Sequence, residues 1–277
     1  MLQKLITDAL AEDIGTGDHS TLCCIEPEVM GNAVLKVKQN GVLAGMEVAE
    51  FIFKMLDKNS IFSQKLFDGQ EMKYGDIAFE VKAHVHTILK AERLVLNIMQ
   101  RMSGIATLTR EYSDKTKTYK TKLLDTRKTT PNFRLLEKEA VKIGGGFNHR
   151  FGLYDMIMLK DNHIDYCGGI EKAINKARDY VNNHARLKIE IETRNLDDVK
   201  QVINVGKVDR IMLDNFKPSE IIEALKLING KFETEASGGI TLENIVEFAA
   251  TGVDYISSGA LIHQARSLDL SLKAVII

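Results

Sequence analysis

Residues 187–215 read LKIEIETRNLDDVKQVINVGKVDRIMLDN, and this stretch decides the fold. An apolar run at 187–192 is followed by an amphipathic segment at 196–205 and then by a second apolar run at 210–214. Short apolar runs predict buried strands, and apolar residues at helical spacing predict a helix between them. Strand, helix and strand in this order predict a parallel βαβ unit.

The same alternation continues on both sides of this stretch. We expect strands at 122–125, 156–160, 187–192, 210–214, 232–236 and 254–257, and helices at 133–143, 170–182, 196–205, 218–228 and 241–251. Such a series forms a parallel sheet covered by helices and is typical of a barrel-like α/β fold.

The first 85 residues predict a smaller α+β domain. Helices are expected at 1–12 and 46–56, and short strands at 67–85. A long helix is expected to follow at 87–112. Residues 32–45 read as a hairpin, because apolar residues flank Asn40-Gly41, a strong two-residue turn signal. Gly104 in the long helix predicts a close packing contact, since glycine there costs about 1 kcal/mol against alanine.

The composition of the 277 residues excludes several classes of protein. Lys plus Arg is 37 and Asp plus Glu is 38, so the formal net charge is −1, and nothing indicates a nucleic-acid partner or a membrane surface. No apolar run approaches the length of a membrane span, and no secretory signal pattern is present. Cys23, Cys24 and Cys167 form no disulfide framework or zinc motif. We therefore expect a cytoplasmic protein.

Polar or glycine-rich residues follow every expected strand of the parallel series. Because ligands of parallel α/β folds bind at the carboxyl ends of the strands, six such ends together predict a shared site. These segments are Asp125–Thr129, Lys160–His163, Glu192, Asp214-Asn215, Ser237–Gly239 and Ser258–Ala260.

The charges of these segments indicate an anionic ligand. Arg127, Lys128, Arg150 and Lys160 bring four cations to the ends of different elements, and such groups suit phosphates and carboxylates. The loops Ser237-Gly238-Gly239 and Ser258-Gly259-Ala260 precede helix starts, where backbone N–H groups can approach a phosphate.

Two carboxylates, Glu192 and Asp214, end neighbouring strands. They could hold Mg²⁺ or stabilise a positively charged transition state, or they could form salt bridges with the nearby cations. His149 lacks metal-ligand spacing and is interpreted as a hydrogen-bonding residue of the site. Asp161, Asn162 and His163 are either part of the site or a helix cap and turn.

Residues 125–164, DTRKTTPNFRLLEKEAVKIGGGFNHRFGLYDMIMLKDNHI, resemble the signature of the quinolinate phosphoribosyltransferase family, also called nicotinate-nucleotide pyrophosphorylase (carboxylating). The resemblance continues through EDIGTGDHST at 12–21, AERLVLNIMQRMSGIAT at 91–107, ASGGIT at 236–241 and TGVDYISSGALIHQARSLDLSL at 251–272. It implies an incomplete α/β barrel of the TIM type with an N-terminal α+β domain. The implied division is 1–110 for the N-terminal domain and its helix, 111–265 for the barrel and 266–277 for a tail that packs on the N-terminal domain.

The resemblance also implies a reaction. Quinolinate and 5-phosphoribosyl 1-pyrophosphate would give nicotinate mononucleotide, pyrophosphate and CO₂ in NAD biosynthesis, with Mg²⁺ required. The family further implies a homodimer whose sites lie at the subunit interface.

Residue roles carry over from the family motifs onto matching positions. Quinolinate binding is implied for Arg127, His149, Arg150 and Lys160, with Arg93 contributed by the partner subunit. The catalytic residues implied are Lys128, Lys160, Glu192 and Asp214, and the last two lie near the ribose and Mg²⁺. Thr129 belongs to the same substrate-binding segment as Arg127 and Lys128. The 5-phosphate cradle is matched by Ser237, Gly238, Gly239, Ser258, Gly259 and Ala260. Asn132, where the family usually has glycine, and Thr193-Arg194 depart from the pattern and affect local loop shape.

Three other interpretations compete with this one. A relative associated with molybdenum transport shares the TRK-type segment, but such relatives usually lack the element that Lys160–His163 retains. A phosphate-binding barrel isomerase would not need so many cations beside its phosphate cradle. A metabolite-binding module without activity would be indicated by loss of Glu192, Lys128 or Lys160, and all three are present.

Overall fold

The computed structural model describes residues 1–184 and 186–275. The chain forms two compact units, which are described separately. The first unit contains residues 1–110, 129–145 and 262 onward, and the barrel unit contains residues 111–128 and 146–261. None of the described helices is long and apolar enough to cross a membrane.

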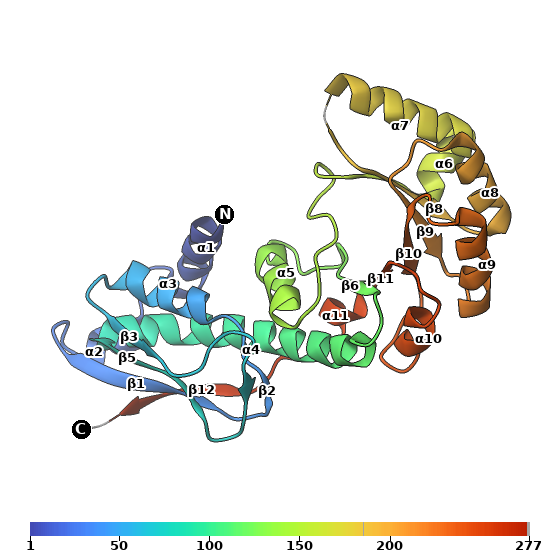
Figure 1. Ribbon diagram of the computed structural model, residues 1–277. Helices are drawn as coiled ribbons and strands as arrows, with labels where there is room; N and C mark the ends of the chain where they lie inside the picture. The colour runs from blue at the N-terminus through green and yellow to red at the C-terminus, as the bar shows by residue number, and fades with distance from the viewer. Residues whose placement is uncertain (185, 276–277) are drawn as a thin grey trace. The chain divides into compact units, whose positions relative to one another are not determined.

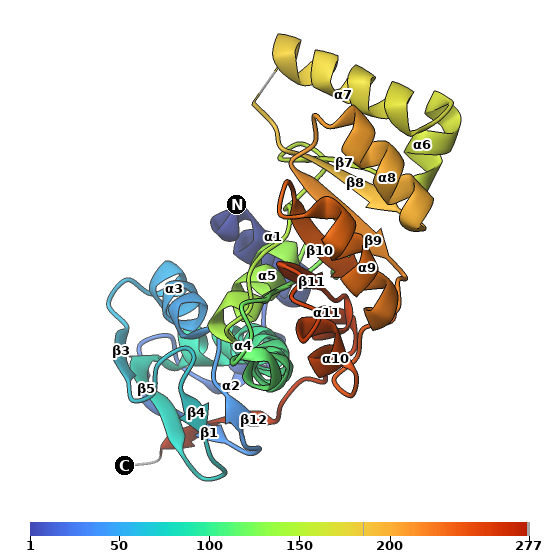
Figure 2. The same cartoon turned by 45° about the vertical axis from the view of Figure 1, so that its right-hand side comes forward.

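A four-stranded antiparallel sheet organises the first unit, in the order β12-β1-β5-β3. Its strands are β1 (Met30–Val37), β3 (Ile61–Gln64), β5 (Ile77–His84) and β12 (Leu270–Val275), and a second pair joins β2 (Gly41–Val42) to β4 (Glu71–Met72). The helices that begin in this unit are α1 (Leu2–Ile14), α2 (His19–Cys24), α3 (Met46–Leu56), α4 (Val85–Thr116) and α5 (Arg134–Ile143). The long helix α4 runs along the sheet (Figures 1 and 2).

The expected hairpin at 32–45 is wrong. Strand β1 ends at Val37 and pairs with β5 and β12, whereas β2 pairs with β4. A two-residue hairpin of the expected type needs positive φ at the turn, and neither Asn40 nor Gly41 has it. The side chain of Asn40 instead accepts a hydrogen bond from the Tyr74 N–H at 2.7 Å. The turn signal is therefore used to join two separate pairings.

Helix α4 is longer than expected, and its glycine packs as predicted. The helix covers Val85–Thr116, and a Cβ at Gly104 would overlap the carbonyl group of Arg266. The chain that leads into β12 can approach the helix this closely only because position 104 has no side chain. Strand β12 then pairs with β1 along Asn32–Val37.

The barrel unit contains a six-stranded parallel sheet in the order β6-β11-β10-β9-β8-β7. Its strands are β6 (Lys122–Leu124), β7 (Ile157–Leu159), β8 (Ile189–Thr193), β9 (Arg210–Asp214), β10 (Glu233–Ser237) and β11 (Tyr255–Ser257). All six predicted strands are confirmed: β9 has the predicted bounds, and the other five differ by one or two residues at one or both ends. Strands β6 and β7 are the two edges of the sheet, which is the arrangement of a barrel left open between its first and second strands.

Helices cover one face of this sheet. They are α6 (Asp161–Cys167), α7 (Ile170–His184), α8 (Leu196–Val205), α9 (Pro218–Ile228) and α10 (Ile245–Ala249), and α11 (Ala260–His263) follows β11. Figures 1 and 2 show α8 and α9 on the same side of strands β8 to β10. Because side chains alternate along a strand, residues such as Ile189, Ile191 and Ile211 belong to one face, and polar residues between them belong to the other. The inner face of the sheet therefore carries charged side chains.

Candidate active site

Parallel pairing brings the predicted carboxyl-end residues to one edge of the sheet, called here the barrel mouth. Ser237 and Asp214 are direct neighbours in the β10–β9 register, and the main-chain N–H of Asn215 donates to the Ser237 carbonyl at 2.8 Å. Glu192 lies one residue before the end of β8, and Lys160 directly follows β7. Four adjacent strands thus each contribute one predicted residue to the mouth.

Lys160, Glu192 and Asp214 form one charged group. The Lys160 Nζ lies 2.5 Å from Glu192 Oε1, and the Asp161 N–H donates to Glu192 Oε2 at 3.3 Å. Burial, and next the negative charge of Glu192, raise the pKa of the Asp214 carboxyl, while Lys160 acts in the opposite direction. The two carboxylates are therefore close enough to repel each other, and the positive charge of Lys160 offsets part of this repulsion.

The segment after Lys160 is a helix start as well as part of the mouth. Asp161 opens helix α6, and His163 Nδ1 accepts a hydrogen bond from the Lys160 N–H at 3.0 Å. The cap interpretation of Asp161–His163 is thus confirmed. This cap fixes the main chain from which Lys160 extends toward Glu192.

Two arginines, Arg127 and Arg150, lie near each other in the barrel unit. Burial, and next the positive charge of Arg127, lower the pKa of the Arg150 guanidinium. Arg150 also donates from Nη1 to the Met156 carbonyl at 3.2 Å, which fixes its direction. The electrostatic energy of two guanidinium groups that repel each other becomes favourable when an anion lies between them, because each guanidinium then has an oppositely charged partner.

The other two members of the 127–129 segment differ in surroundings. Lys128 is exposed, and its N–H donates to Thr126 Oγ1 at 3.0 Å. Thr129 belongs to the first unit, where its hydroxyl accepts a hydrogen bond from Arg134 Nε at 2.9 Å. Arg93 is an exposed residue of α4 in the first unit. Its place at a mouth stays a prediction.

The first of the two predicted phosphate loops has the left-handed backbone that its glycines suggest. Gly238 and Gly239 have φ of 91° and 63°, and a Cβ at Gly238 would overlap the Asn215 side chain. Ser258 donates from its hydroxyl to the Ile240 carbonyl at 3.1 Å, so it ties the second loop to the first. Gly259 then leads into α11, which begins at Ala260. Both loops leave their strands at the mouth, with glycine where the chain turns.

His149 points into the barrel interior. Its side chain is 5% exposed, and Nε2 lies 3.1 Å from Glu190 Oε2 and 3.4 Å from Glu235 Oε2. Burial by itself lowers the pKa of His149, but the hydrogen bonds and charges of the two glutamates outweigh it and raise the pKa to about 9. The Arg150 N–H donates to Nδ1 at 2.6 Å and opposes this, because that bond needs Nδ1 without a proton.

Sequence reasoning missed Glu190, Glu235 and their partner Arg210. Arg210 Nη1 lies 2.8 Å from Glu235 Oε2 and 3.9 Å from Glu190 Oε2. A signal was available, because Glu190 precedes Glu192 by two residues and Glu235 precedes Ser237 by two. Residues two apart on a strand share a face, so both glutamates belong one layer below the mouth.

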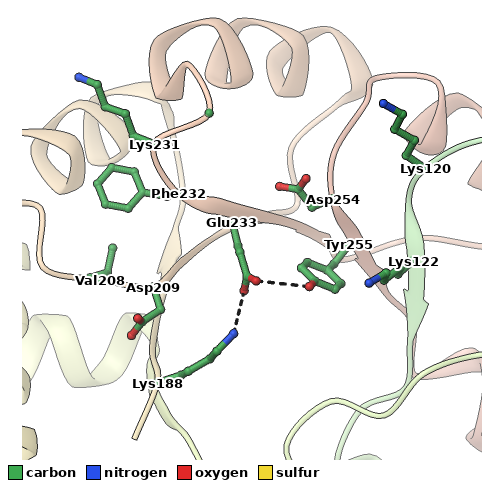
Figure 3. Close-up of a pocket in the computed structure, with 11 residues that line it drawn as sticks. Lys120, Lys122, Lys188, Val208, Asp209, Lys231, Phe232, Glu233, Asp254 and Tyr255 are labelled. Carbon is green, nitrogen blue, oxygen red and sulfur yellow. Dashed lines mark hydrogen bonds and ion pairs between the residues drawn. The ribbon is translucent and has the colours of Figure 1, made fainter. Parts of the chain in front are cut away.

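A separate hollow of about 600 Å³ lies at the amino ends of the strands (Figure 3). Glu233 projects into it, with Oε2 3.4 Å from Lys188 Nζ and Oε1 3.4 Å from the Tyr255 hydroxyl. Lys120, Lys122 and Lys231 also line it. The hollow faces away from the carboxyl ends, so it is not the predicted site.

Two family models match the chain. One, described as quinolinate phosphoribosyl transferase, C-terminal domain, matches residues 105–273, and the corresponding N-terminal domain matches residues 18–103. The chain belongs to the quinolinate phosphoribosyltransferase family.

Individual members of the quinolinate phosphoribosyltransferase family are similar to this chain over nearly all of its length. A probable nicotinate-nucleotide pyrophosphorylase (carboxylating) of Bacillus subtilis is 44% identical, over 98% of this chain and 92% of that protein. A quinolinate phosphoribosyltransferase (decarboxylating) of Nicotiana tabacum is 43% identical, over 98% and 82%. The solved nicotinate-nucleotide pyrophosphorylase of Francisella tularensis is 41% identical, with a TM-score of 0.91 over 99% of this chain and 96% of that one. The predicted fold class, an incomplete barrel with an N-terminal α+β domain, is confirmed.

Proposed function

We propose that the chain transfers the phosphoribosyl group of 5-phosphoribosyl 1-pyrophosphate to quinolinate and releases nicotinate mononucleotide, pyrophosphate and CO₂. Family membership supports the reaction, and the names of the relatives describe it from both directions. The observation that carries the proposal in this chain is the mouth itself, where two mutually repelling arginines accompany two carboxylates and a lysine. A dicarboxylate and a sugar cation need these opposite environments side by side.

Arg127 and Arg150 are the proposed ligands of the quinolinate carboxylates. Guanidinium groups bind carboxylates through paired hydrogen bonds, and a substrate with two adjacent carboxylates relieves the repulsion between both arginines. Nicotinate carries one carboxylate and would leave part of this repulsion in place. We therefore propose selectivity for the dicarboxylate.

The donor is proposed to lie across the two glycine loops. Ser237–Gly239 and Ser258–Ala260 would hold its 5-phosphate through main-chain N–H groups, and Lys128 and Lys160 would face its reacting region. The positive φ of Gly238 and Gly239 supports this role, since it lets the backbone approach a ligand without a Cβ.

Glu192 and Asp214 are proposed to stabilise the sugar as the bond to pyrophosphate breaks. The anomeric carbon then has oxocarbenium character, and two nearby carboxylates lower the free energy of that cation. The quinolinate ring nitrogen attacks the same carbon. Arg127 and Arg150 keep the ring in line during this step. The carboxylate next to the new pyridinium nitrogen then leaves as CO₂, and its bonding electron pair stays on the ring carbon, where the adjacent positive nitrogen stabilises it until a proton from water takes the place of CO₂.

The donor set also fits Mg²⁺. Glu192 and Asp214 supply the hard oxygen ligands that Mg²⁺ prefers. Burial, and next the negative charge of Glu192, raise the pKa of Asp214, so a cation bound between the two carboxylates would relieve their repulsion. A bound Mg²⁺ would neutralise charge on the pyrophosphate leaving group. Lys160, paired with Glu192, would supply part of the same neutralisation from the protein.

The assembly proposed is a homodimer in which Arg93 enters the partner's site. Its exposure on α4 supports this, because an exposed side chain is accessible to a partner subunit. The cytoplasm is the proposed location. The three cysteines are free, as is expected in a reducing compartment.

The test is an assay with quinolinate, the phosphoribosyl donor and Mg²⁺, in which nicotinate mononucleotide and CO₂ are both measured. Nicotinate in place of quinolinate is the control substrate. Formation of product from quinolinate alone supports the proposal. Equal rates with both acids would exclude the dicarboxylate role of the arginines, and no turnover with either would leave the metabolite-binding interpretation.

A further inference from the structure

A buried group of four charged or titratable side chains lies beneath the mouth. His149, Glu190, Arg210 and Glu235 come from the loop before β7 and from strands β8, β9 and β10. Each is at most 10% exposed at its side chain. The interior of a parallel α/β barrel is usually filled with branched apolar residues, so this layer is unusual.

Burying these charged side chains costs desolvation free energy, so their presence in the barrel interior needs an explanation. Two carboxylates face one guanidinium, and the imidazole is the remaining partner for the second negative charge. An apolar set of similar volume often stabilises a protein as well as, or better than, a buried ion-pair group. Stability alone therefore does not account for these residues.

The group is connected directly to the arginine of the mouth. Glu190 and Glu235 hold Nε2 of His149, and the Arg150 N–H donates to Nδ1 of the same ring. The main chain is fixed from another side, because the His149 N–H donates to Asp125 Oδ1 at 2.8 Å. The residue before Arg150, His149, is therefore held through both its main chain and its ring, which fixes the main chain from which the Arg150 side chain extends.

We propose that Glu190 and Glu235 are positioning residues for quinolinate binding, which act through the ring of His149 on the place of Arg150. The inference rests on the proposed function of the mouth. Arg210 serves the same purpose indirectly, since it keeps the Glu235 carboxylate in place. Neither glutamate needs to touch the substrate, and their effect falls on the quinolinate half of the site.

The charged groups that surround the His149 ring come from three neighbouring strands, β8, β9 and β10. Glu190 comes from β8, Glu235 from β10 and Arg210, one step further, from β9, while Asp125 after β6 faces the main chain. Removing the Glu235 charge leaves Glu190 as the only one of the two glutamate charges at Nε2. The positive charge of Arg210 is then less well balanced near the ring. The ring then loses one of the two negative charges that hold it.

The test compares Glu235→Gln with Glu233→Gln in the full chain. Glu233 lies on the same strand and also pairs with Arg210, at 3.2 Å, so Glu233→Gln is a matched control that keeps both the Glu190 and the Glu235 carboxylates beside the His149 ring. We expect Glu235→Gln to raise the KM and the calorimetric Kd for quinolinate on the order of tenfold to a hundredfold, as for a displaced binding group. The KM for the phosphoribosyl donor should stay within about twofold in both variants.

A nuclear magnetic resonance titration of His149 shows whether Glu235 acts on the ring itself, which the quinolinate KM alone does not show. Its pKa should fall in Glu235→Gln and stay in Glu233→Gln. If Glu235→Gln folds poorly, Arg210→Gln/Glu235→Gln removes opposite charges together and should still raise the quinolinate KM. An unchanged quinolinate KM, or an equal rise in Glu233→Gln, would overturn the positioning role. Failure of the unmodified chain to use quinolinate would instead reject the proposed function.

Discussion

Lys160 and Glu192 are 32 positions apart in the chain, and their side chains meet at 2.5 Å. The contact follows from the parallel pairing of β7 and β8, which places Leu159 beside Ile191. A lysine that ends one strand and a glutamate near the end of the next are thereby held together at the mouth. Each carries a charge that the proposed reaction uses, and the pair keeps both in place before substrates bind.

Replacing Glu192 or Asp214 should affect turnover more than binding. Alanine at either position removes a carboxylate that stabilises the charged transition state, so kcat should fall on the order of a hundredfold or more, with a smaller rise in KM. Steady-state kinetics and thermal unfolding are measured on the same preparations. Glu223→Ala, an exposed acid of α9, is the control and should leave both unchanged. A lower melting temperature with normal kcat would mean that the carboxylates only brace the mouth.

Arg150→Ala should weaken quinolinate binding specifically. Loss of one charged hydrogen bond costs about 1.5–3 kcal/mol, which corresponds to roughly a 10- to 150-fold rise in the quinolinate Kd. Calorimetry with each substrate separately gives the comparison. Arg194→Ala is the matched control, because this exposed arginine pairs with Asp165 and Asp198. Equal losses for both substrates would argue against the assigned role.

Mixing two inactive variants tests whether Arg93 acts across a dimer. Arg93→Ala and Lys160→Ala, exchanged at random, give half mixed dimers, and each mixed dimer has one site free of both defects. About a quarter of the unmodified activity should therefore return. Mass spectrometry confirms the exchange. No recovery in exchanged dimers would place Arg93 within its own chain's site or outside the reaction.

Asn132 has φ of 62°, in the left-handed region of backbone conformation. Asparagine tolerates this left-handed conformation better than other residues with a Cβ. Asn132→Ala should therefore lower the free energy of unfolding by about 1 kcal/mol, while Asn132→Gly should leave it nearly unchanged or raise it. Urea unfolding measures the three proteins. Equal stability of the alanine and glycine variants would contradict this account.

Stability should depend on pH through His149. Its pKa is raised to about 9 in the folded chain, against about 6.5 for an ordinary histidine. The contribution is therefore fully present below about pH 6.5 and is lost as the pH rises through 9. Urea unfolding at pH 6.5 and 9.5 should show a drop that is smaller in Glu235→Gln. An equal drop in both proteins would assign the pH dependence to other groups.

The sequence predicts the barrel well because the local spacing of apolar residues indicates each strand and most of the helices there. Helices α8 and α9 begin and end where the spacing of Val199, Val202, Ile221 and Ala224 places them. The pairing of β1 was not predictable in this way, since its partner β12 lies near the other end of the chain. A local turn signal at Asn40-Gly41 cannot report a partner that distant.

The candidate site likewise contains residues that local sequence predicts and residues that depend on tertiary structure. Glu192, Asp214 and Lys160 could be named because each ends a strand, and parallel strands share an edge. The inward direction of His149 depends on Glu190 and Glu235, which are recognised only once the face of each strand is known. The side-chain pairings are therefore a product of tertiary register.

The charged layer inside the barrel also constrains how the sequence can drift. His149, Glu190, Arg210 and Glu235 lie on four separate segments, and the loss of one charge leaves another buried without its counterpart. A substitution at one of the four positions is thus tolerable mainly when a second compensates for it. Lineages that diverge from this chain should exchange these residues in correlated steps, while the exposed faces of α8 and α9 vary independently.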